Sequence, residues 1–394
     1  MKINTKAVHA GDRKKAGPGI PVTVPIYTAS SYIYEEVAQL DRVFGREETG
    51  DSYARYENPT NRALEEVLAS LESGTAALAC ASGMAAIQFA LQAALIDRRK
   101  HIVAADALYG ATIRMLQSIF EPFGVETTFV DICDLNAVQK AIADKKPGCV
   151  LMETVSNPLL RVGAMDRIAA AAKAAGAALV VDNTFATPVM LRPIELGANL
   201  VVHSVTKYLS GHGDVLGGAI VADQEHAGLI RTLSRVAGPV LGPFESYLTM
   251  RGIKTFPLRY ERQCQNACRI ASWMAAQPSI EHVYYLADPK HPDAEAIRRL
   301  FPENCYGAMI SFEIKGADRA AVFAFMDRLQ LIVRATSLGD VHSMALYPAM
   351  SSHRDIAPRQ RERMGIRDNL VRMSVGIEAV EDILADLQNA LYTG

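Results

Sequence analysis

An acid and a lysine each follow a short apolar run near the middle of the chain. Asp182 comes directly after residues 178–181, and Lys207 lies just beyond residues 199–202. Apolar runs of this length are typical of buried parallel strands. Because the carboxyl ends of strands border the ligand crevice of an open α/β sheet, we expect both side chains to face one site. A pyridoxal phosphate enzyme needs such a pair: the amine forms a Schiff base, and the carboxylate keeps the pyridine nitrogen protonated.

The residues around Lys207 favour a ligand site over a solvated surface position. A lysine taken alone is usually exposed. Here Ser204 and Thr206 lie two residues apart, so both can face one phosphate group, and a glycine-rich turn follows over residues 211–218. Glycine lets the backbone approach a ligand closely. A lysine desolvated beside an aldehyde cofactor can serve as Schiff-base partner and as proton shuttle.

A second candidate phosphate site is the turn Ser82-Gly83-Met84, which lies between a predicted strand and a predicted helix. A helix N-terminus offers unpaired N–H groups and a positive dipole end, to which Ser82 adds a hydroxyl. Turns of this composition are most often purely structural. This one does not match the P-loop pattern, and no GxGxxG sequence occurs, which argues against a nucleotide-dependent dehydrogenase.

Tyr109 and Arg372 could act on the cofactor and the substrate. Tyr109 follows the apolar run 102–105 and would emerge at the same sheet edge, where its ring could stack on a planar cofactor and its hydroxyl could transfer a proton. A packing or surface tyrosine is the alternative. Arg372 lies inside an apolar strand candidate and needs an anionic partner, which a substrate carboxylate would supply. Glu153 and Asn157 also follow a strand, and a loop cap with a turn before Pro158 is their structural interpretation.

Strand and helix patterns alternate through the middle of the chain and predict a mainly parallel sheet covered on both faces. Asp134 is a candidate N-cap for one helix, and Thr60 or Asn61 for the helix that begins near residue 60. The predicted strands are 76–80, 102–105, 127–130, 150–152, 179–181, 200–202 and 219–221, and the helices between them are 84–95, 112–120, 135–143 and 165–175.

The flanking regions differ in character, and we expect an N-terminal arm over residues 1–58, a cofactor-binding α/β domain over 59–250 and a smaller α+β domain over 251–394. The arm is rich in glycine and proline, and it could pack on another subunit. Within it, Arg55 could bind a phosphate dianion and Tyr53 could donate a further hydrogen bond, although an exposed arginine is the ordinary alternative. The later predicted helices are 244–253, 258–276, 319–329 and 380–391, and the strands are 283–285, 309–314, 331–335 and 370–374.

Composition narrows the class of protein. The 394 residues are 49% hydrophobic and 21% charged with a net charge of −2, as in an ordinary globular protein. Lys and Arg are spread along the chain, so no nucleic-acid partner is expected. No apolar run is long enough for a membrane span, and no signal peptide is recognisable, so we expect a cytoplasmic protein. The six cysteines form no CxxC pair, which favours reduced thiols and no metal site.

These motifs together resemble the Cys/Met-metabolism family of pyridoxal phosphate enzymes. The resemblance implies the fold of the aspartate aminotransferase type (fold type I). The matching segments span nearly the whole chain: YARYENPTNRALE, CASGMAAI, LYGAT, ETVSNPLL, VVDNTFATP, VVHSVTKYLSGHGDVLGG, MRGIKT, TSLGD and LVRMSVGIE.

The resemblance assigns roles to individual residues. Lys207 would be the Schiff-base lysine, Asp182 would pair with the pyridine nitrogen, and Tyr109 would stack on the ring. The α-carboxylate of the substrate would bind Arg372, helped by Ser337 and Asn157. The remaining cofactor-binding residues, several of them around the phosphate, would be Ser82, Gly83, Met84, Thr184, Ser204 and Thr206, joined by Tyr53 and Arg55 of a neighbouring subunit. A shared site implies a dimer as the minimum active unit, and the family is usually tetrameric.

The implied activity is γ-elimination or γ-replacement on a sulfur amino acid or an activated homoserine, of the cystathionine γ-lyase or γ-synthase type. Methionine γ-lyase, O-acylhomoserine sulfhydrylase and cystathionine β-lyase are the alternatives. Ala111 stands where methionine γ-lyases carry cysteine, and His342 and Gln263 also depart from common family patterns. A pyridoxal phosphate-binding protein without turnover is disfavoured because four site residues are retained together: Lys207, Asp182, Tyr109 and Arg372. We expect the substrate preference to be set near Glu57, Ala111 and His342.

Overall fold

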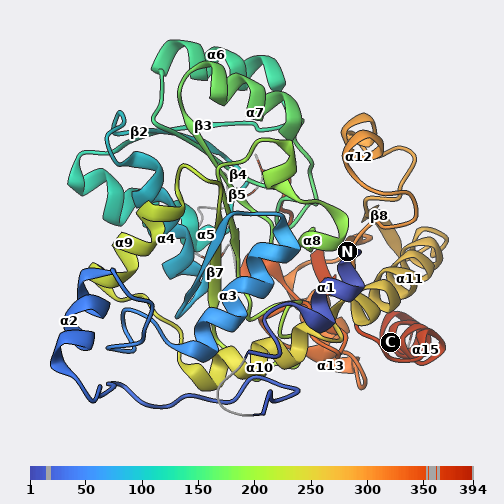
Figure 1. Ribbon diagram of the computed structural model, residues 1–394. Coiled ribbons are helices and arrows are strands. Elements are labelled where there is room, and N and C mark those ends of the chain that lie inside the picture. The colour runs from blue at the N-terminus through green and yellow to red at the C-terminus, as the bar shows by residue number, and fades with distance from the viewer. Residues whose placement is uncertain (15–18, 352–353, 355–360, 362–363, 393–394) are drawn as a thin grey trace.

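The computed structural model describes residues 1–14, 19–351, 354, 361 and 364–392. It contains two β-sheets with helices packed around them (Figure 1). The larger sheet has the strand order β1-β7-β6-β5-β4-β2-β3. Its strands are β1 Ala76–Cys80, β2 His101–Ala105, β3 Glu126–Val130, β4 Cys149–Glu153, β5 Ala178–Asp182, β6 Leu200–His203 and β7 Gly218–Ala222.

The predicted α/β class with a mostly parallel sheet is confirmed, with one antiparallel strand inside it. β7 runs antiparallel to both of its neighbours, β1 and β6, while the remaining pairs are parallel. Six of the seven strands are buried along most of their length because helices cover both faces, which explains their continuous apolar runs.

Helix α4 (Gly83–Leu95) packs against β5, β6 and β7, whereas α6 (Leu135–Lys145) packs against β2 and α7 (Met165–Ala174) against β5. Along this strand order, the connection from β1 to β2 through α4 runs toward the β3 edge of the sheet. The connections from β3 to β4 through α6 and from β4 to β5 through α7 run toward the β1 edge. Right-handed crossovers therefore put α4 on the opposite face from α6 and α7. Other helices around this sheet are α3 Pro59–Glu72, α5 Gly110–Met115, α8 Thr187–Met190, α9 Ala227–Ala237 and α10 Pro243–Ile253.

Two sequence-based predictions for these helices need correction. The N-cap of α3 is Asn58, not Thr60 or Asn61: Asn58 Oδ1 accepts the N–H groups of both of those residues at 2.9 and 3.3 Å. Pro59 fits the first helical position because the N–H that it lacks would have no intrahelical partner there. The helix predicted over 112–120 begins at Gly110 and changes into a π-helical turn over Leu116–Phe120. Asp134 caps α6 as predicted, through Ala137 N at 3.0 Å.

The smaller sheet has the strand order β10-β11-β12-β9-β8. Its strands are β8 Ile280–Tyr284, β9 Met309–Ile314, β10 Val333–Arg334, β11 Met344–Leu346 and β12 Leu370–Ser374. Strand β11 was not predicted, and of the strand predicted over 331–335 only the two exposed residues Val333 and Arg334 form a strand, β10. Helices α12 Ala294–Leu300, α13 Arg319–Arg328 and α15 Val380–Tyr392 accompany this sheet.

Helix α11 (Phe256–Ala275) links the two parts of the molecule. Its first turns, with Phe256 and Tyr260, belong to the core of the large sheet, and its last turns, with Ile270 and Met274, belong to the core of the small sheet. The small sheet thereby keeps a defined position beside the carboxyl ends of the large one, although the domain bounds at 58/59 and 250/251 remain a prediction.

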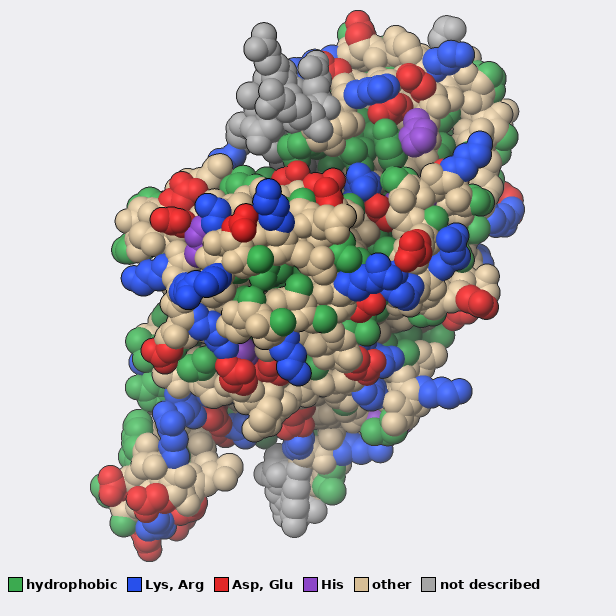
Figure 2. Space-filling view, turned by 90° about the horizontal axis from the view of Figure 1, so that it is seen from above, with side chains coloured by type: hydrophobic (Ala, Val, Ile, Leu, Met, Phe, Trp, Pro, Cys, Tyr) green, Lys and Arg blue, Asp and Glu red, His purple; other side chains and the backbone are tan. Residues whose placement is uncertain are grey.

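The N-terminal segment carries two short helices, α1 Ile3–His9 and α2 Val37–Gly45. It is anchored to α3 through Thr60, whose hydroxyl accepts Tyr27 N at 2.9 Å and donates to Pro25 O at 3.0 Å. Figure 2 shows acidic and basic side chains interspersed over one face of the molecule. Within the described ranges, no helix is both long and apolar enough to cross a bilayer.

Candidate active site

A cavity of about 460 Å³ lies at the carboxyl ends of β4, β5 and β6, and residues of the small sheet close its other side. Parallel strands present their carboxyl ends to ligands in folds of this class. The cavity brings together all of the predicted site residues except Tyr53 and Arg55. Those that line it are Ser82, Gly83, Met84, Tyr109, Asn157, Asp182, Thr184, Ser204, Thr206, Lys207, Ser337 and Arg372.

Lys207 extends into this cavity from the turn after β6. Its Nζ donates to Ser337 Oγ at 2.9 Å, and no carboxylate is paired with it among the described residues. Burial, and next the nearby Arg372 cation, lower the pKa of the Lys207 amine to about 8. A substantial fraction of the amine is therefore neutral near physiological pH, as a nucleophile or proton acceptor must be.

Asp182 ends β5 on the face of the sheet that borders the cavity. Its Oδ1 accepts the N–H of Thr184 at 2.9 Å, and Thr184 Oγ1 accepts the N–H of Ser204 at 2.9 Å. These bonds tie the ends of β5 and β6 together. Burial raises the pKa of the Asp182 carboxyl, and the hydrogen bonds from Thr184 oppose that change. A buried carboxylate in this position favours a cationic partner, as a protonated ring nitrogen would be.

Arg372 belongs to β12 of the small sheet and is only 4% exposed. Its Nη1 donates to Asn157 Oδ1 at 2.9 Å and its Nη2 to Ser337 O at 3.1 Å, while its buried Nε has no partner. Burial lowers the pKa of the guanidinium to about 10, so the group remains cationic at neutral pH. Within the described part of the chain its partners are neutral oxygens, which leaves the charge available to an anionic ligand.

The first turn of α4 and the turn after β6 form a concave surface suited to a phosphate. Ser82 caps α4 by accepting Ala85 N at 3.0 Å, so the N–H groups of Gly83 and Met84 remain available at the cavity. A Cβ on Gly83 would lie 3.0 Å from Ser204 Cβ, so a side chain there would crowd the segment opposite. The hydroxyl of Thr206, in contrast, is engaged by its own loop, because it accepts Gly217 N at 2.9 Å and donates to Gly217 O at 3.1 Å.

Tyr109 stands at the start of α5 with its side chain partly exposed at the cavity. Its backbone N–H donates to Glu153 Oε1 at 2.6 Å. Glu153 was interpreted from the sequence as a loop cap and was not among the predicted site residues, yet it also lines the cavity. Sequence spacing could not reveal this contact, since the two residues are 44 positions apart.

Tyr53 and Arg55 lie away from the cavity of their own chain. Arg55 donates to Arg235 O, and its guanidinium lies over the rings of Tyr53 and Tyr56.

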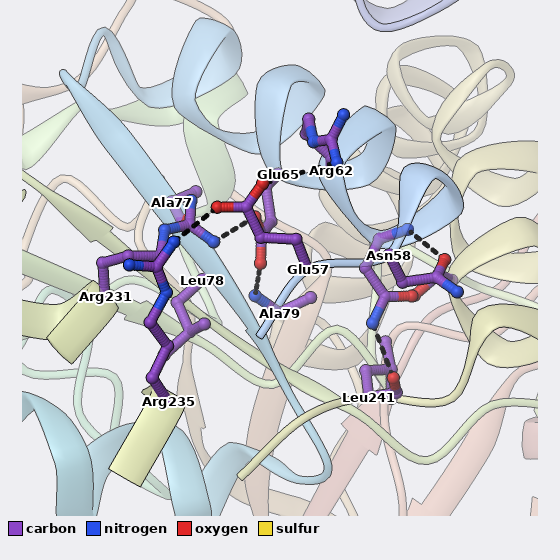
Figure 3. A network of polar contacts seen from close by, with 12 residues as sticks. Glu57, Asn58, Arg62, Glu65, Ala77, Leu78, Ala79, Arg231, Arg235 and Leu241 are labelled. Atoms are coloured by element: carbon purple, nitrogen blue, oxygen red, sulfur yellow. Dashed lines mark hydrogen bonds and ion pairs between the residues drawn. The ribbon is translucent and has the colours of Figure 1, made fainter. Parts of the chain in front are cut away.

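A network of polar contacts lies beside Arg55. In Figure 3, Glu65 accepts hydrogen bonds from Arg231 Nη1 at 2.8 Å and Ala79 N at 3.1 Å, and Glu57 is paired with Arg235 at 2.7 Å. The contribution of Tyr53 and Arg55 to a neighbouring subunit stays a prediction.

The sequence also missed the apolar part of the cavity wall, because apolar residues carry no signature of their own in a pattern search. The missed apolar lining residues are Ile87, Val155, Phe185, Leu216, Leu338 and Leu346, and the hydroxyl residues Thr336 and Ser351 were missed as well. The three departures from family patterns lie elsewhere: Ala111 is in α5, Gln263 is buried and donates to Asp340 O at 2.7 Å, and His342 pairs with Asp340 at 2.9 Å. Of the described residues that border the cavity, none is Glu57, Ala111 or His342.

Comparisons with known proteins agree with this geometry. The family model of Cys/Met metabolism PLP-dependent enzymes matches residues 4–392. The chain is 41% identical to L-methionine gamma-lyase of Fusobacterium nucleatum subsp. polymorphum, over 99% of this chain and 98% of that protein. It is also 41% identical to cystathionine gamma-lyase of Bacillus subtilis, over 99% of both chains. The crystal structure of cystathionine gamma synthase from Xanthomonas oryzae pv. oryzae, in complex with aminoacrylate and cysteine, superposes with a TM-score of 0.92 at 36% identity, covering 99% of this chain and 98% of that one. The protein is therefore a member of the Cys/Met metabolism family of PLP-dependent enzymes, whose members act as carbon–sulfur lyases and transferases of trans-sulfuration.

Proposed function

We propose that this enzyme catalyses γ-elimination or γ-replacement on a sulfur amino acid or an activated homoserine, with cystathionine γ-lyase or γ-synthase chemistry as the first candidate. The observation that carries the proposal is one connected arrangement: Lys207 donates to Ser337 Oγ, and Arg372 donates to Ser337 O and to Asn157. Ser337 therefore contacts both the Lys207 amine, which would accept a proton, and the Arg372 guanidinium, which would bind the substrate carboxylate.

The residues present fit pyridoxal phosphate. Lys207 would hold the cofactor covalently, Asp182 would pair with its ring nitrogen, and Tyr109 would stack on its ring. Its phosphate would lie at the first turn of α4, against Gly83, Met84 and Ser204, with Tyr53 and Arg55 added by a neighbouring subunit. When bound, pyridoxal phosphate supplies an electron sink for a carbanion at the substrate Cα.

The protein residues then position the substrate and move protons. Arg372 binds the α-carboxylate through its free N–H groups, which orients the Cα–H bond toward Lys207. The neutral amine of Lys207 removes that proton and can return it at a neighbouring carbon atom. Tyr109 lines the cavity, and its hydroxyl would protonate the leaving sulfur or oxygen.

Methionine γ-elimination is a second candidate, and the chemistry of the cavity wall favours it. Of the described lining residues, the acidic and basic ones are Glu153, Asp182, Lys207 and Arg372, and none of these lies free for a second amino-acid head group. The outer wall, with Leu216, Leu338 and Leu346, suits a methyl thioether. The 41% identity with a methionine gamma-lyase equals that with a cystathionine gamma-lyase and does not separate the two candidates, while Ala111 in place of the usual cysteine argues against methionine γ-elimination.

We propose a homotetramer in the cytoplasm, with a dimer as the minimum active unit. The support is that Tyr53 and Arg55 do not line the cavity of their own chain, whereas the resemblance gives both of them a cofactor contact. Mixing an inactive Lys207→Ala chain with an inactive Arg55→Ala chain tests this arrangement. Shared sites would restore part of the activity in mixed assemblies, and sites confined to one chain would restore none.

A substrate panel tests the activity. Purified holoenzyme is incubated with cystathionine, methionine, cysteine, and an O-acylhomoserine with and without cysteine, and ketoacid and thioether products are measured. Borohydride treatment followed by peptide mapping is the parallel assay of the cofactor. We expect a reduced pyridoxyl group on Lys207; a colourless protein, or one labelled at another lysine, would refute the proposal.

A further inference from the structure

Glu153 is a buried carboxyl group that none of the steps above uses. It ends β4, is 9% exposed, and borders the cavity next to Tyr109 and Asn157. In the described structure it pairs with no arginine or lysine. A buried carboxyl group without a cationic partner costs folding free energy, so its contacts need another explanation.

The contacts of Glu153 converge on two site residues. Its Oε1 accepts the backbone N–H of Tyr109 at 2.6 Å. The backbone N–H of Asn157 also interacts favourably with the carboxyl group. Asn157 in turn accepts from Arg372 Nη1 at 2.9 Å. The Glu153 carboxyl group therefore connects Tyr109, whose ring lines the cavity, with Asn157, which accepts a hydrogen bond from the buried Arg372 guanidinium.

The position of Glu153 beside Asp182 indicates its charge state. The two residues are directly paired across β4 and β5, so their side chains leave the sheet on the same face. Burial, and next the neighbouring Asp182, raise the pKa of Glu153 well above that of an ordinary glutamic acid. Burial also raises the pKa of Asp182, but there the hydrogen bonds from Thr184 oppose the rise, whereas the neighbouring Asp182 adds to the rise at Glu153, so we take Asp182 as the carboxylate of the pair.

We propose that Glu153 is a positioning residue, whose side-chain oxygen holds the backbone of Tyr109 and Asn157 so that the ring and the guanidinium keep their places around the substrate. The proposal rests on the proposed function, since it assigns Glu153 a task in that reaction. An uncharged glutamic acid performs this task with its carbonyl oxygen and leaves the negative charge on Asp182. It follows that a neutral group of the same shape should replace Glu153 without loss.

Two variants of equal length separate the acceptor from the charge. Glu153→Gln keeps an oxygen acceptor and imitates the protonated acid, whereas Glu153→Met keeps the volume and offers no comparable acceptor. Holoenzyme is prepared for each, together with Glu126→Gln at an exposed position of β3 as the control. The measurements are bound pyridoxal phosphate by absorbance, visible circular dichroism of the bound cofactor, and kcat and KM on the best substrate of the panel.

We expect Glu153→Gln to keep kcat/KM within about threefold of the wild type and to leave the circular dichroism unchanged. Glu153→Met should lose about 100-fold in kcat/KM with altered circular dichroism, because a displacement of about 1 Å in a positioned group costs a factor of that order. Combined with Tyr109→Ala, the Glu153→Met loss should shrink, since the ring that it positions is already absent.

Three results would overturn the proposal: a Glu153→Gln enzyme as impaired as Glu153→Met, a Glu153→Met enzyme like the wild type, or fully additive losses in the double variant. If Glu153→Met does not fold, the Glu153→Gln result decides by itself, because the proposal requires that variant to work. Failure of the proposed function is distinct: the wild type would then bind no pyridoxal phosphate or turn over no member of the panel.

Discussion

Replacing Arg372 by alanine removes a cation that has no anionic partner among the described residues. The guanidinium donates to two neutral oxygens, and its remaining N–H groups can form two charge-assisted hydrogen bonds to a substrate carboxylate. Hydrogen bonds to charged groups contribute about 1.5–3 kcal/mol each, so the loss in kcat/KM should be about 3 kcal/mol or more, which is at least about 100-fold. Most of this loss should appear as a higher KM, because the carboxylate is bound before and during the reaction.

Arg372→Lys is the matched variant. Lysine keeps the charge but offers no planar fork, so it should restore charge attraction without bidentate geometry and give an intermediate KM. Removing the charge should also raise the pKa of Lys207 slightly, since the Arg372 cation is the smaller of the two causes that lower it and burial persists.

The assay is steady-state kinetics on the best substrate of the panel, with cofactor content measured by absorbance for every variant. An Arg372→Ala enzyme with wild-type KM and full cofactor content would refute the carboxylate role. A loss confined to kcat would instead indicate that Arg372 acts through Ser337 and Lys207.

Three further predictions follow from the same geometry. Lys207→Ala should abolish turnover and covalent cofactor attachment, measured by product formation and by borohydride labelling; residual labelling elsewhere would contradict the assignment. Because only the neutral amine is reactive and the pKa of Lys207 is about 8, the rate at which apoenzyme captures pyridoxal phosphate should rise about tenfold from pH 6 to 7 and level off above pH 9. A rate that falls across this range would exclude Lys207 as the limiting group. Asn58→Ala should lower the free energy of unfolding by about 1–2 kcal/mol through the lost cap of α3, measured by urea unfolding, whereas Asn58→Asp retains the cap acceptor and should lose less.

Local chemistry made several site residues recognisable without a structure. A polar or charged residue at the end of an apolar strand, as with Asp182 and Lys207, has few structural reasons to be there, and the carboxyl end of a parallel strand is where ligands bind. Arg372 was conspicuous for a related reason, since a buried guanidinium inside an apolar strand needs compensation. The strand and helix alternation predicted the large sheet well, because strands buried on both faces read as continuous apolar runs.

Patterns failed where the outcome depended on distant parts of the chain. The direction of β7 depends on its pairing with β1 and β6, which no local sequence specifies. The strand β11 is three residues long and exists through its neighbours β10 and β12. The cap of α3 was misassigned because several residues near Pro59 can accept backbone N–H groups, and only the path of the chain selects Asn58.

The sequence by itself determined the family and the cofactor and predicted Lys207 as the reactive lysine, because these depend on residue types next to strands and on motifs that extend along the chain. The tertiary structure alone decided how those residues connect. It placed Ser337 between Lys207 and Arg372, engaged the Thr206 hydroxyl within its own loop, and set Glu153 against the backbone of Tyr109. Except for that of Thr206, these contacts join segments that are far apart in the chain, and the contact between Lys207 and Ser337 depends on the packing of the two sheets through α11. Tertiary packing decides which donor and acceptor atoms come within hydrogen-bonding distance of each other, whereas the sequence specifies only which donor and acceptor groups are present.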